Sequence, residues 1–389
     1  MAKSSVVIAP DSFKGTIDAT AAAEAIAAGW RRVRPDDDVS LLPQADGGEG
    51  TLAALAGSDP HADWQDTGPV TGPDGRPVAG RWVRLGDGRA AAELAVVSGL
   101  PLLQSPDPLG ASTRGLGEVL RAIAADDAAS RQRQDRRPDA EPRLRSSERR
   151  EILVGLGGSA STDGGAGLLT ALGARFLDAS GHSLPPGGGQ LFRLARVDLS
   201  ALVRPGPITV LSDVTAPLLG PTGAARVFGP QKGASAADID ILDRGLARLA
   251  DLIGVDPQQP GLGAAGGTAY ALVAVLGAHL VPGAPFVART TGLVAAAARA
   301  DVLITGEGRL DATSQAGKTV GHALELSGPH HRIVIAGAVE TAPADCRAYS
   351  LTQLAGSADR AVAQPARWLR EAGAAAAADF EAARDGGRP

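Results

Sequence analysis

The chain is poor in cysteine, in aromatic residues and in long apolar segments. Its single cysteine, Cys346, excludes an internal disulfide and a cysteine-rich metal site. Aromatic residues make up only 3% of the composition, so the core must consist mainly of Ala, Val, Leu and Ile. The first ten residues show no cleavable signal pattern. The longest apolar stretch, 269–288, contains a histidine and two prolines, which favours a buried helix and a turn over a membrane span.

The chain also lacks a strong net charge and the short motifs of several enzyme classes. A net charge of −5 gives no overall attraction to nucleic acid or to an anionic membrane, so an anionic ligand would need a local basic or amide-lined pocket. The six histidines show no metal-ligand spacing such as H-E-x-x-H, and no G-x-S-x-G nucleophile motif is present. These properties are those of a cytoplasmic enzyme that acts on a small molecule, and we expect no nucleic-acid or membrane partner.

Apolar runs predict an α/β fold with parallel strands. A strand at 6–9, a helix at 17–33, a strand at 39–42 and a helix from Thr51 follow one another with short loops. Runs 81–85 and 90–94 could pair as a hairpin. Further strands are expected at residues 151–155, 208–211, 302–305, 333–336 and 349–354.

The strands near the two chain ends resemble each other, and this predicts a discontinuous domain. We expect a five-stranded domain built from residues 1–67 and 290–389, with a second α/β domain of residues 68–289 inserted into it. Residues 126–150 form a polar tract with almost no apolar side chains, which we interpret as a disordered surface loop.

Two loops near the N-terminus combine charged residues with glycine. In APDSFKG, residues 9–15, Asp11 and Lys14 lie between an expected strand and an expected helix, where an ammonium group beside free amides would suit a phosphate or a carboxylate. Alone, this motif is explained more simply as a helix cap with a solvated lysine. In ADGGEGT, residues 45–51, Asp46 and Glu49 flank two glycines and could hold Mg²⁺. An acidic helix start in a plain turn explains this second motif equally well.

Two loops in the middle of the chain carry similar residues. GLGGSASTDGGAG, residues 155–167, offers amides, hydroxyls and one acid, Asp163, and so many small residues are costly in chain entropy unless a ligand must come close. The segment 212–234 contains Asp213, which suits a metal ion or a hydroxyl group, and Lys232, which suits a phosphate. A helix cap and a surface lysine explain these two residues equally well when each is taken alone.

The last such loop, TGEGRLDATSQAGKT at residues 305–319, crowds acids and bases after an expected strand. Its charged residues are Glu307, Arg309, Asp311 and Lys318. Mixed charges in a glycine-rich loop suit a metal ion together with phosphates. A solvated cluster of ion pairs is the weaker alternative.

Three segments approach known nucleotide-binding patterns. GLGGSA, residues 155–160, matches G-x-G-x-x-A after a strand, and Asp178 lies at a suitable distance for a ribose contact, as in a nicotinamide-dependent oxidoreductase. However, this loop continues before its helix begins. GLGAAG, residues 261–266, follows no strand, and residues 312–319 miss the first glycine of a P-loop.

Taken together, the loops resemble the bacterial glycerate kinases of the class that has no Walker A motif. APDSFKG, ADGGEGT, GGSASTDGG, SDVTAPLLG, VFGPQKGA, GAAGG and ITGEGRLD…GK occur in the order of that family and cover nearly the whole chain. Thr162 and Ala216 stand where the family usually has asparagine, and residues 126–150 resemble an insertion. The resemblance implies a flavodoxin-like parallel-sheet domain, a smaller inserted α/β domain and an active site in the cleft between them. It also implies ATP, Mg²⁺ and D-glycerate, usually giving 2-phosphoglycerate.

On this basis we predict roles for the charged residues of the loops. Lys14, Lys232 and Lys318 would neutralise phosphate or the glycerate carboxylate. Asp213, Glu307 and Asp311 are the candidate metal ligands. Asp46 or Asp163 would orient the attacking hydroxyl and accept its proton, and Asp213 is a further catalytic candidate. The remaining predicted substrate- and ATP-binding residues are Ser12, Gly47, Gly48, Glu49, Gly158, Ser159 and Arg309.

Two other functions stay open at this point. One is a nicotinamide-dependent hydroxy-acid oxidoreductase, and the other is a non-catalytic regulator that binds a small acid. The density of acids and lysines over several loops argues against binding alone. The sequence does not decide between 2- and 3-phosphoglycerate as the product, and it leaves the oligomeric state open, a homodimer being compatible with it.

Overall fold

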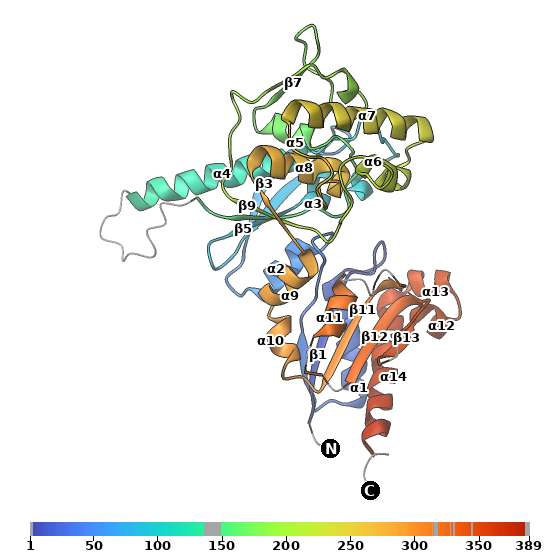
Figure 1. Cartoon of the computed structure of the whole chain (residues 1–389). Helices are drawn as coiled ribbons and strands as arrows, with labels where there is room; N and C mark the ends of the chain where they lie inside the picture. The colour runs from blue at the N-terminus through green and yellow to red at the C-terminus, as the bar shows by residue number, and fades with distance from the viewer. Residues whose placement is uncertain are drawn as a thin grey trace. The chain divides into compact units, whose positions relative to one another are not determined.

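The structure, a computed structural model, describes residues 3–135, 149–312, 314, 318–326, 328, 329, 331–343 and 345–385. Its contacts divide the chain into two compact α/β units (Figure 1). Unit 1 comprises Met1–Asp46, Ala53–Ser58 and Gly283–Pro389, and unit 2 comprises Gly47–Leu52 and Asp59–Pro282. Unit 1 is therefore built from both chain ends, as expected, but the inserted unit is the longer of the two and not the smaller.

Unit 1 has the strand order of a flavodoxin-like domain. Its five strands are β1 (Ser5–Pro10), β2 (Asp38–Leu41), β11 (Val302–Leu310), β12 (His331–Val339) and β13 (Arg347–Ser350). They lie in the order β13-β12-β11-β1-β2, and all their pairings are parallel. Numbered within the unit, this order is 2-1-3-4-5 read from the opposite edge, which is the doubly wound arrangement.

Helices cover both faces of the unit 1 sheet because alternate strand residues point to opposite sides. Val6 and Ile8 of β1 pack with α1 (Ala19–Val33) and α14 (Pro365–Asp385). Val7, from the other face of β1, packs with the second group of helices. That group is α9 (Gly283–Thr290), α10 (Leu293–Ala297) and α11 (Thr319–Glu325). Two short helices follow β13, namely α12 (Leu351–Ala355) and α13 (Ala358–Ala363).

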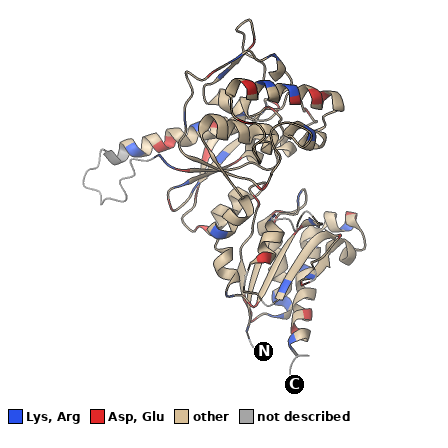
Figure 2. Cartoon of the chain, in the orientation of Figure 1, with Lys and Arg blue, Asp and Glu red and all other residues tan. Residues whose placement is uncertain are grey.

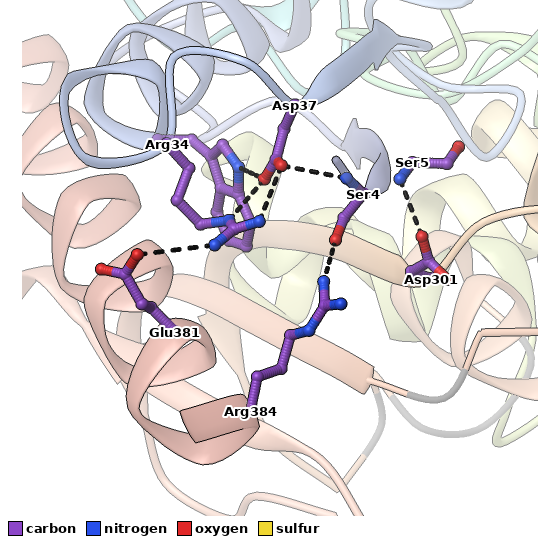
Figure 3. A network of polar contacts seen from close by, with 8 residues as sticks. Ser4, Ser5, Arg34, Asp37, Asp301, Glu381 and Arg384 are labelled. Carbon is purple, nitrogen blue, oxygen red and sulfur yellow. Dashed lines mark hydrogen bonds and ion pairs between the residues drawn. The ribbon is translucent and has the colours of Figure 1, made fainter. Parts of the chain in front are cut away.

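A buried polar network joins α1 and α14 to the start of β1 (Figure 3). Asp37 accepts hydrogen bonds from Arg34 at 2.7 Å and 2.8 Å, from the Trp30 indole at 2.9 Å and from the Ser4 amide at 3.0 Å. Arg34 also lies 3.6 Å from Glu381 of α14. Burial alone would raise the pKa of Asp37, but its hydrogen bonds outweigh burial and lower it. The network therefore holds the C-terminal helix against the N-terminal strand.

Unit 2 contains a six-stranded mixed sheet. Its strands are β3 (Asp63–Thr71), β4 (Pro77–Arg84), β5 (Ala90–Glu93), β6 (Ile152–Gly155), β9 (Ile208–Leu211) and β10 (His279–Val281). The order is β10-β9-β6-β5-β4-β3, with parallel pairing from β10 to β5 and antiparallel pairing from β5 to β3. A separate antiparallel ribbon pairs β7 (Arg175–Leu177) with β8 (Arg196–Asp198).

The helices of unit 2 are α3 (Leu94–Ser98), α4 (Arg114–Asp135), α5 (Ala166–Ala171), α6 (Ala224–Phe228), α7 (Ala236–Ile253) and α8 (Ala264–Leu276). The remaining helix, α2 (Thr51–Ser58), is divided between the two units: its first residues belong to unit 2 and its last residues to unit 1. In α7, Leu242, Leu246 and Leu249 are buried, while residues of both charges lie along the helix in Figure 2. No helix among the described residues is long and apolar enough to cross a membrane.

Several predicted boundaries differ from the structure. The first domain boundary lies before residue 67 because β3 pairs with β4 in the sheet of unit 2. The second lies at Gly283 because α9 packs in unit 1. Helix α4 continues through residues predicted to be a disordered loop, since Asp127 pairs with Arg131 one turn later at 2.9 Å. Residues 136–148 of that predicted loop lie outside the described residues.

The predicted strand 349–354 is wrong in its second part, whereas the predicted hairpin is confirmed. The segment 349–354 ends β13 at Ser350 and continues as α12. The reason is a helix cap, because the Ser350 hydroxyl accepts a hydrogen bond from the Gln353 amide. The predicted hairpin is present, since β4 and β5 pair antiparallel.

Candidate functional site

The predicted APDSFKG loop follows β1, whereas the predicted loop 305–319 begins inside β11, since this strand continues to Leu310 and includes Glu307 and Arg309. Strands β1 and β11 are neighbours in the sheet. The chain leaves β1 toward the face that α1 covers and leaves β11 toward the face that α11 covers. This reversal is the topological switch point of a doubly wound sheet, where ligands bind beyond the carboxyl ends of the strands. The fold therefore places the APDSFKG loop and the start of the ITGEGRLD segment at a preferred ligand position.

The APDSFKG loop is held in a fixed turn. The Asp11 amide donates to the carbonyl of Gly306 at 2.8 Å, and the Phe13 amide donates to the carbonyl of Ile17 at 2.9 Å. The Phe13 side chain is buried in the core and anchors the turn. Gly15 has φ of 75°, a left-handed conformation that glycine adopts without strain. The rigid turn leaves Lys14 exposed between two anchored residues.

A pocket of about 460 Å³ opens at this position, and all the residues that line it belong to unit 1. One side is charged and polar, with Asp11, Ser12, Lys14, Asp46, Glu307 and Lys318. The opposite side is apolar, with Ala338, Leu351, Ala358, Ala361, Val362 and Pro365. Arg309 also lines the pocket, but its exposed guanidinium pairs with Glu340.

Two acids of the pocket titrate away from their ordinary range. Burial, together with the neighbouring charge of Asp46, raises the pKa of Asp11 to about 7, against an opposing hydrogen bond from the Thr319 hydroxyl at 2.8 Å. Burial also raises the pKa of Glu307. Asp11 can therefore exchange a proton near neutral pH.

Two buried polar atoms of the pocket have no partner among the described residues. They are the Glu307 Oε1 carboxylate oxygen and the Ser12 hydroxyl. Buried polar groups in proteins are nearly always hydrogen-bonded, so such atoms at a pocket indicate the contacts of a bound ligand.

The acids of unit 1 fit Mg²⁺ bound together with a phosphate, but not a metal held by protein alone. Mg²⁺ prefers oxygen ligands and is usually bound through one or two carboxylates plus phosphate oxygens and water. Glu307 has the orphaned oxygen, and the charge of Asp311 is close enough to raise its pKa. No group of three or more His, Cys, Asp or Glu residues in the described parts of the chain forms a ready metal cluster.

In unit 2, the glycines of two predicted loops allow unusually close backbone approach. A Cβ atom at Gly47 would lie 2.3 Å from the Leu211 carbonyl oxygen at the end of β9. A Cβ atom at Gly157 would lie 2.3 Å from Cα of Gly48. The Gly157 amide also donates to the Gly47 carbonyl at 3.2 Å. The ADGGEG loop is therefore packed directly against the strand ends of the unit 2 sheet, and side chains at these glycines would displace it.

Glu93, the last residue of β5, holds the same loop and was missed by the sequence analysis. Its two carboxylate oxygens accept hydrogen bonds from the Gly50 amide at 3.1 Å and the Leu52 amide at 2.9 Å. Burial raises the pKa of Glu93 to about 7, although these hydrogen bonds oppose the shift. Glu93 is thus a positioning residue for the loop that contains Glu49.

Lys232 is a buried cation inside the glycine-rich loop of unit 2. Its ammonium group donates to the Ser159 hydroxyl at 2.8 Å and to the Ser161 carbonyl. Burial lowers the pKa of Lys232 to about 7, against the opposing charge of Asp163. The hydroxyl groups of Ser161 and Thr162 are also buried and lack hydrogen-bond partners among the described residues. A charged group and unpaired donors in one loop are the elements of an anion site.

Asp163, in contrast, is fully buried, and both its carboxylate oxygens are occupied. One oxygen accepts from the Thr113 amide, the Thr113 hydroxyl and the Gly167 amide at 2.8–3.1 Å, and the other accepts from the Gly165 amide at 3.1 Å. A carboxylate with four donors acts by holding the loop in place. The structure therefore argues against Asp163 as the proton acceptor predicted from the sequence.

The chain is similar to known proteins over almost its whole length. A family model for the glycerate kinase family matches residues 6–381. The chain belongs to the glycerate kinase family. It is 41% identical to the Bacillus subtilis glycerate kinase over 81% of this chain and 79% of that protein, and 40% identical to the Escherichia coli glycerate 2-kinase over 85% and 84%. The crystal structure of a glycerate kinase 2 from Salmonella typhimurium LT2 superposes with a TM-score of 0.73 at 36% identity, covering 99% and 100% of the two chains.

As a member of the glycerate kinase family, the protein is a phosphotransferase that acts on glycerate. The oxidoreductase alternative is also disfavoured by the structure. GLGGSA follows β6, but α5 begins only at Ala166, and the next strand is part of a separate ribbon. The Asp178 carboxylate accepts from the Ser180 and His182 amides of its own turn at 2.9 Å and 3.0 Å.

The predicted site residues thus separate into two clusters. Unit 1 brings six of them together at its pocket, namely Ser12, Lys14, Asp46, Glu307, Arg309 and Lys318. Unit 2 joins Lys232 to Ser159 and packs Gly47 and Gly48 against the strand ends. Glu49 and Gly158 are exposed in unit 2, and Asp213 is half-buried two residues beyond β9. Asp11 lines the unit 1 pocket but was not among the predicted site residues, because its raised pKa comes from burial and from the charge of Asp46, which the local sequence does not show.

Proposed function

We propose that the protein transfers the terminal phosphoryl group of ATP to the 2-hydroxyl group of D-glycerate in a reaction that requires Mg²⁺. One observation carries the proposal: the unit 1 pocket combines lysines, carboxylates and an apolar wall at the switch point of a doubly wound sheet. A triphosphate needs the positive charge of the lysines, and a metal ion needs the oxygen ligands of the carboxylates. The Escherichia coli relative named as a glycerate 2-kinase supports 2-phosphoglycerate as the product.

Phosphoryl transfer requires accurate positioning and positive charge around the transferred group. We propose that Lys14 and Lys318, which line the pocket, neutralise phosphate oxygens. Mg²⁺, held by Glu307 with Asp311 nearby, would supply further positive charge. The unpaired Ser12 hydroxyl would donate a hydrogen bond to a phosphate oxygen. Arg309 is a weaker candidate because Glu340 already engages it.

The attacking hydroxyl must lose a proton. We propose that Asp11 accepts it, with burial and the neighbouring charge of Asp46 raising its pKa. This proposal moves the predicted role from Asp46 itself to the adjacent carboxylate. An acid with a pKa of about 7 can accept the proton at neutral pH and release it afterwards.

Glycerate carries a carboxylate, which needs a positively charged partner. We propose that Lys232 and the hydroxyls of Ser159, Ser161 and Thr162 recognise this carboxylate. The predicted metal or hydroxyl contact of Asp213 remains part of the proposal.

A direct assay tests the reaction. The purified protein is incubated with ATP, Mg²⁺ and D-glycerate, ADP release is followed with a coupled assay, and the product is identified by phosphorus NMR. We expect ADP and 2-phosphoglycerate in equal amounts, no turnover with L-glycerate, and loss of turnover on chelation of the metal that added Mg²⁺ restores. A 3-phosphoglycerate product would reject the assigned hydroxyl. NAD reduction by glycerate without ADP release would reject the proposed function as a whole.

A further inference from the structure

The apolar side of the unit 1 pocket has no task in the proposed chemistry of phosphate, metal and hydroxyl. It is formed by the end of β12 and by α12 and α13. Ala338, Leu351 and Val362 are among its residues, and every residue that β12, α12 and α13 contribute to the pocket is uncharged. The phosphates of a nucleotide would gain nothing from this surface, because ions lose hydration there without finding partners.

Val362 is the most exposed large apolar residue of this wall. Its side chain, on α13, is 57% exposed, although Ala361 beside it is buried at 5%. Exposed aliphatic side chains at the rim of a pocket are typical of surfaces that a ligand covers.

The floor of the pocket is shaped by glycine. Gly337 and Gly308 face each other on adjacent strands, and a Cβ atom at Gly337 would lie 2.3 Å from the carbonyl oxygen of Gly308. The Thr352 hydroxyl, which also lines the wall, donates to the Gly337 carbonyl at 2.9 Å. This hydrogen bond and the close contact between the two strands hold the wall in place, and the glycines keep side-chain bulk out of the floor of the pocket.

Resting on the proposed use of ATP, we propose that this wall binds the adenine base, with Val362 packed against one ring face, while Lys14 and Lys318 hold the phosphates. The charge distribution sets the orientation of the nucleotide, since both lysines of the pocket come from other segments than β12, α12 and α13, which contribute no charged residue to it. Burying apolar surface contributes about 25 cal/mol per Å² removed from water, so the base adds affinity that an inorganic polyphosphate lacks.

The test replaces Val362 by a neutral polar residue, which adds no charge that could repel phosphate. Val362→Asn is compared with Val362→Ile and with Val294→Asn, a matched control because Val294 is a valine 39% exposed on α10 of the same unit. Dissociation constants for ADP and for inorganic tripolyphosphate are measured by calorimetry, and KM values for ATP and D-glycerate by the coupled assay.

We expect Val362→Asn to raise the dissociation constant of ADP and the KM for ATP by about tenfold, with tripolyphosphate binding and the KM for D-glycerate within about twofold of wild type. Val294→Asn should behave like wild type, whereas Val362→Ile, which keeps an apolar side chain on the wall, should retain the affinity for ADP that Val362→Asn loses. Unchanged ADP binding in Val362→Asn, or an equal loss of tripolyphosphate binding, would overturn the base site while leaving ATP as the donor. Absence of ADP binding and ATP turnover in the wild-type protein would instead reject the proposed function.

Discussion

Replacing Lys232 by methionine separates what this lysine does for stability from what it does for activity. Burial lowers the pKa of its ammonium group from 10.5 to about 7. A shift of one pKa unit corresponds to about 1.4 kcal/mol, so a buried charge of this kind destabilises the folded state by roughly 5 kcal/mol at neutral pH. Methionine has a similar length and fills the same space without a charge.

Removing the buried charge should stabilise Lys232→Met, but the loss of the hydrogen bonds of Lys232 offsets part of this stabilisation. Its removal leaves the Ser159 hydroxyl and the Ser161 carbonyl without their partner, at roughly 1–3 kcal/mol for an unsatisfied buried group. The loss stays at the lower end because the Ser159 hydroxyl already lies 3.4 Å from the Ser161 carbonyl and can donate to it. At pH 7 we therefore expect Lys232→Met to be more stable than wild type by about 3 kcal/mol.

The sign of this difference depends on pH. Between pH 7 and 10.5 the unfolded lysine binds a proton that the folded one has released, so wild-type stability rises with pH relative to Lys232→Met. The slope is about 1.4 kcal/mol per pH unit, so the difference of about 3 kcal/mol at pH 7 should vanish, and the order of stability reverse, at about pH 9. Urea unfolding followed by hydrogen exchange of unit 2 peptides, repeated at several pH values, measures both the stability difference between the two proteins and its slope with pH. The control is Lys3→Met, since Lys3 is exposed.

The same variant should lose turnover by at least about 100-fold if Lys232 binds the glycerate carboxylate. A variant that is both more stable and inactive would mean that the buried charge is retained for function. The reasoning is refuted if Lys232→Met is fully active, or if it is less stable than wild type at pH 7 by an amount that does not change with pH.

Three further substitutions test the network, the loop and the proton acceptor. Asp37→Ala leaves Arg34 buried without its carboxylate, so urea unfolding of unit 1 should show a loss of about 3–5 kcal/mol with unchanged KM values. Glu93→Gln keeps only one of two acceptors for the Gly50 and Leu52 amides, and exchange of those amides should accelerate about tenfold or more; unchanged exchange would contradict the positioning role. Wild-type kcat/KM should rise with pH through about 7 as Asp11 loses its proton, and Asp11→Asn should lose about 100-fold in rate together with that dependence. A retained pH profile in Asp11→Asn would assign the base elsewhere.

Much of the sheet in each unit could be predicted from the sequence, because buried parallel strands are continuous runs of branched apolar residues. Strands β1, β6 and β11 were found in this way. Strands β3 and β7 were missed, since their residues are largely exposed or the strand is only three residues long. The cap at Ser350 was a readable signal for the start of α12, but an apolar run across it favoured a strand.

The candidate site was predictable as a set of loops but not as a set of roles. Glycine and charge patterns identified residues such as Lys14, which follows β1, and Glu307, which lies in the last part of β11. The roles depend on neighbours far away in the chain. Asp11 acquires its raised pKa from burial and from Asp46, and Asp163 is saturated by donors that include Thr113, 50 residues earlier. A local sequence pattern does not show contacts between residues so far apart in the chain.

The buried ionisable groups should make the two units respond differently to pH. Asp11 in unit 1 and Glu93 in unit 2 have pKa values raised to about 7. Between the ordinary pKa of each acid and pH 7, the folded chain therefore keeps protons that the unfolded chain has lost. Each acid lowers the free energy of unfolding as the pH rises through this range. Lys232, which belongs to unit 2, has the opposite effect: it raises the free energy of unfolding as the pH rises from 7 to 10.5. These groups therefore give unit 2 a stability minimum near pH 7, whereas Asp11 lowers the stability of unit 1 without a later recovery. Each group lies in a loop or at a strand end and not in an apolar core, as expected where charge is kept for binding or catalysis at the expense of folding free energy.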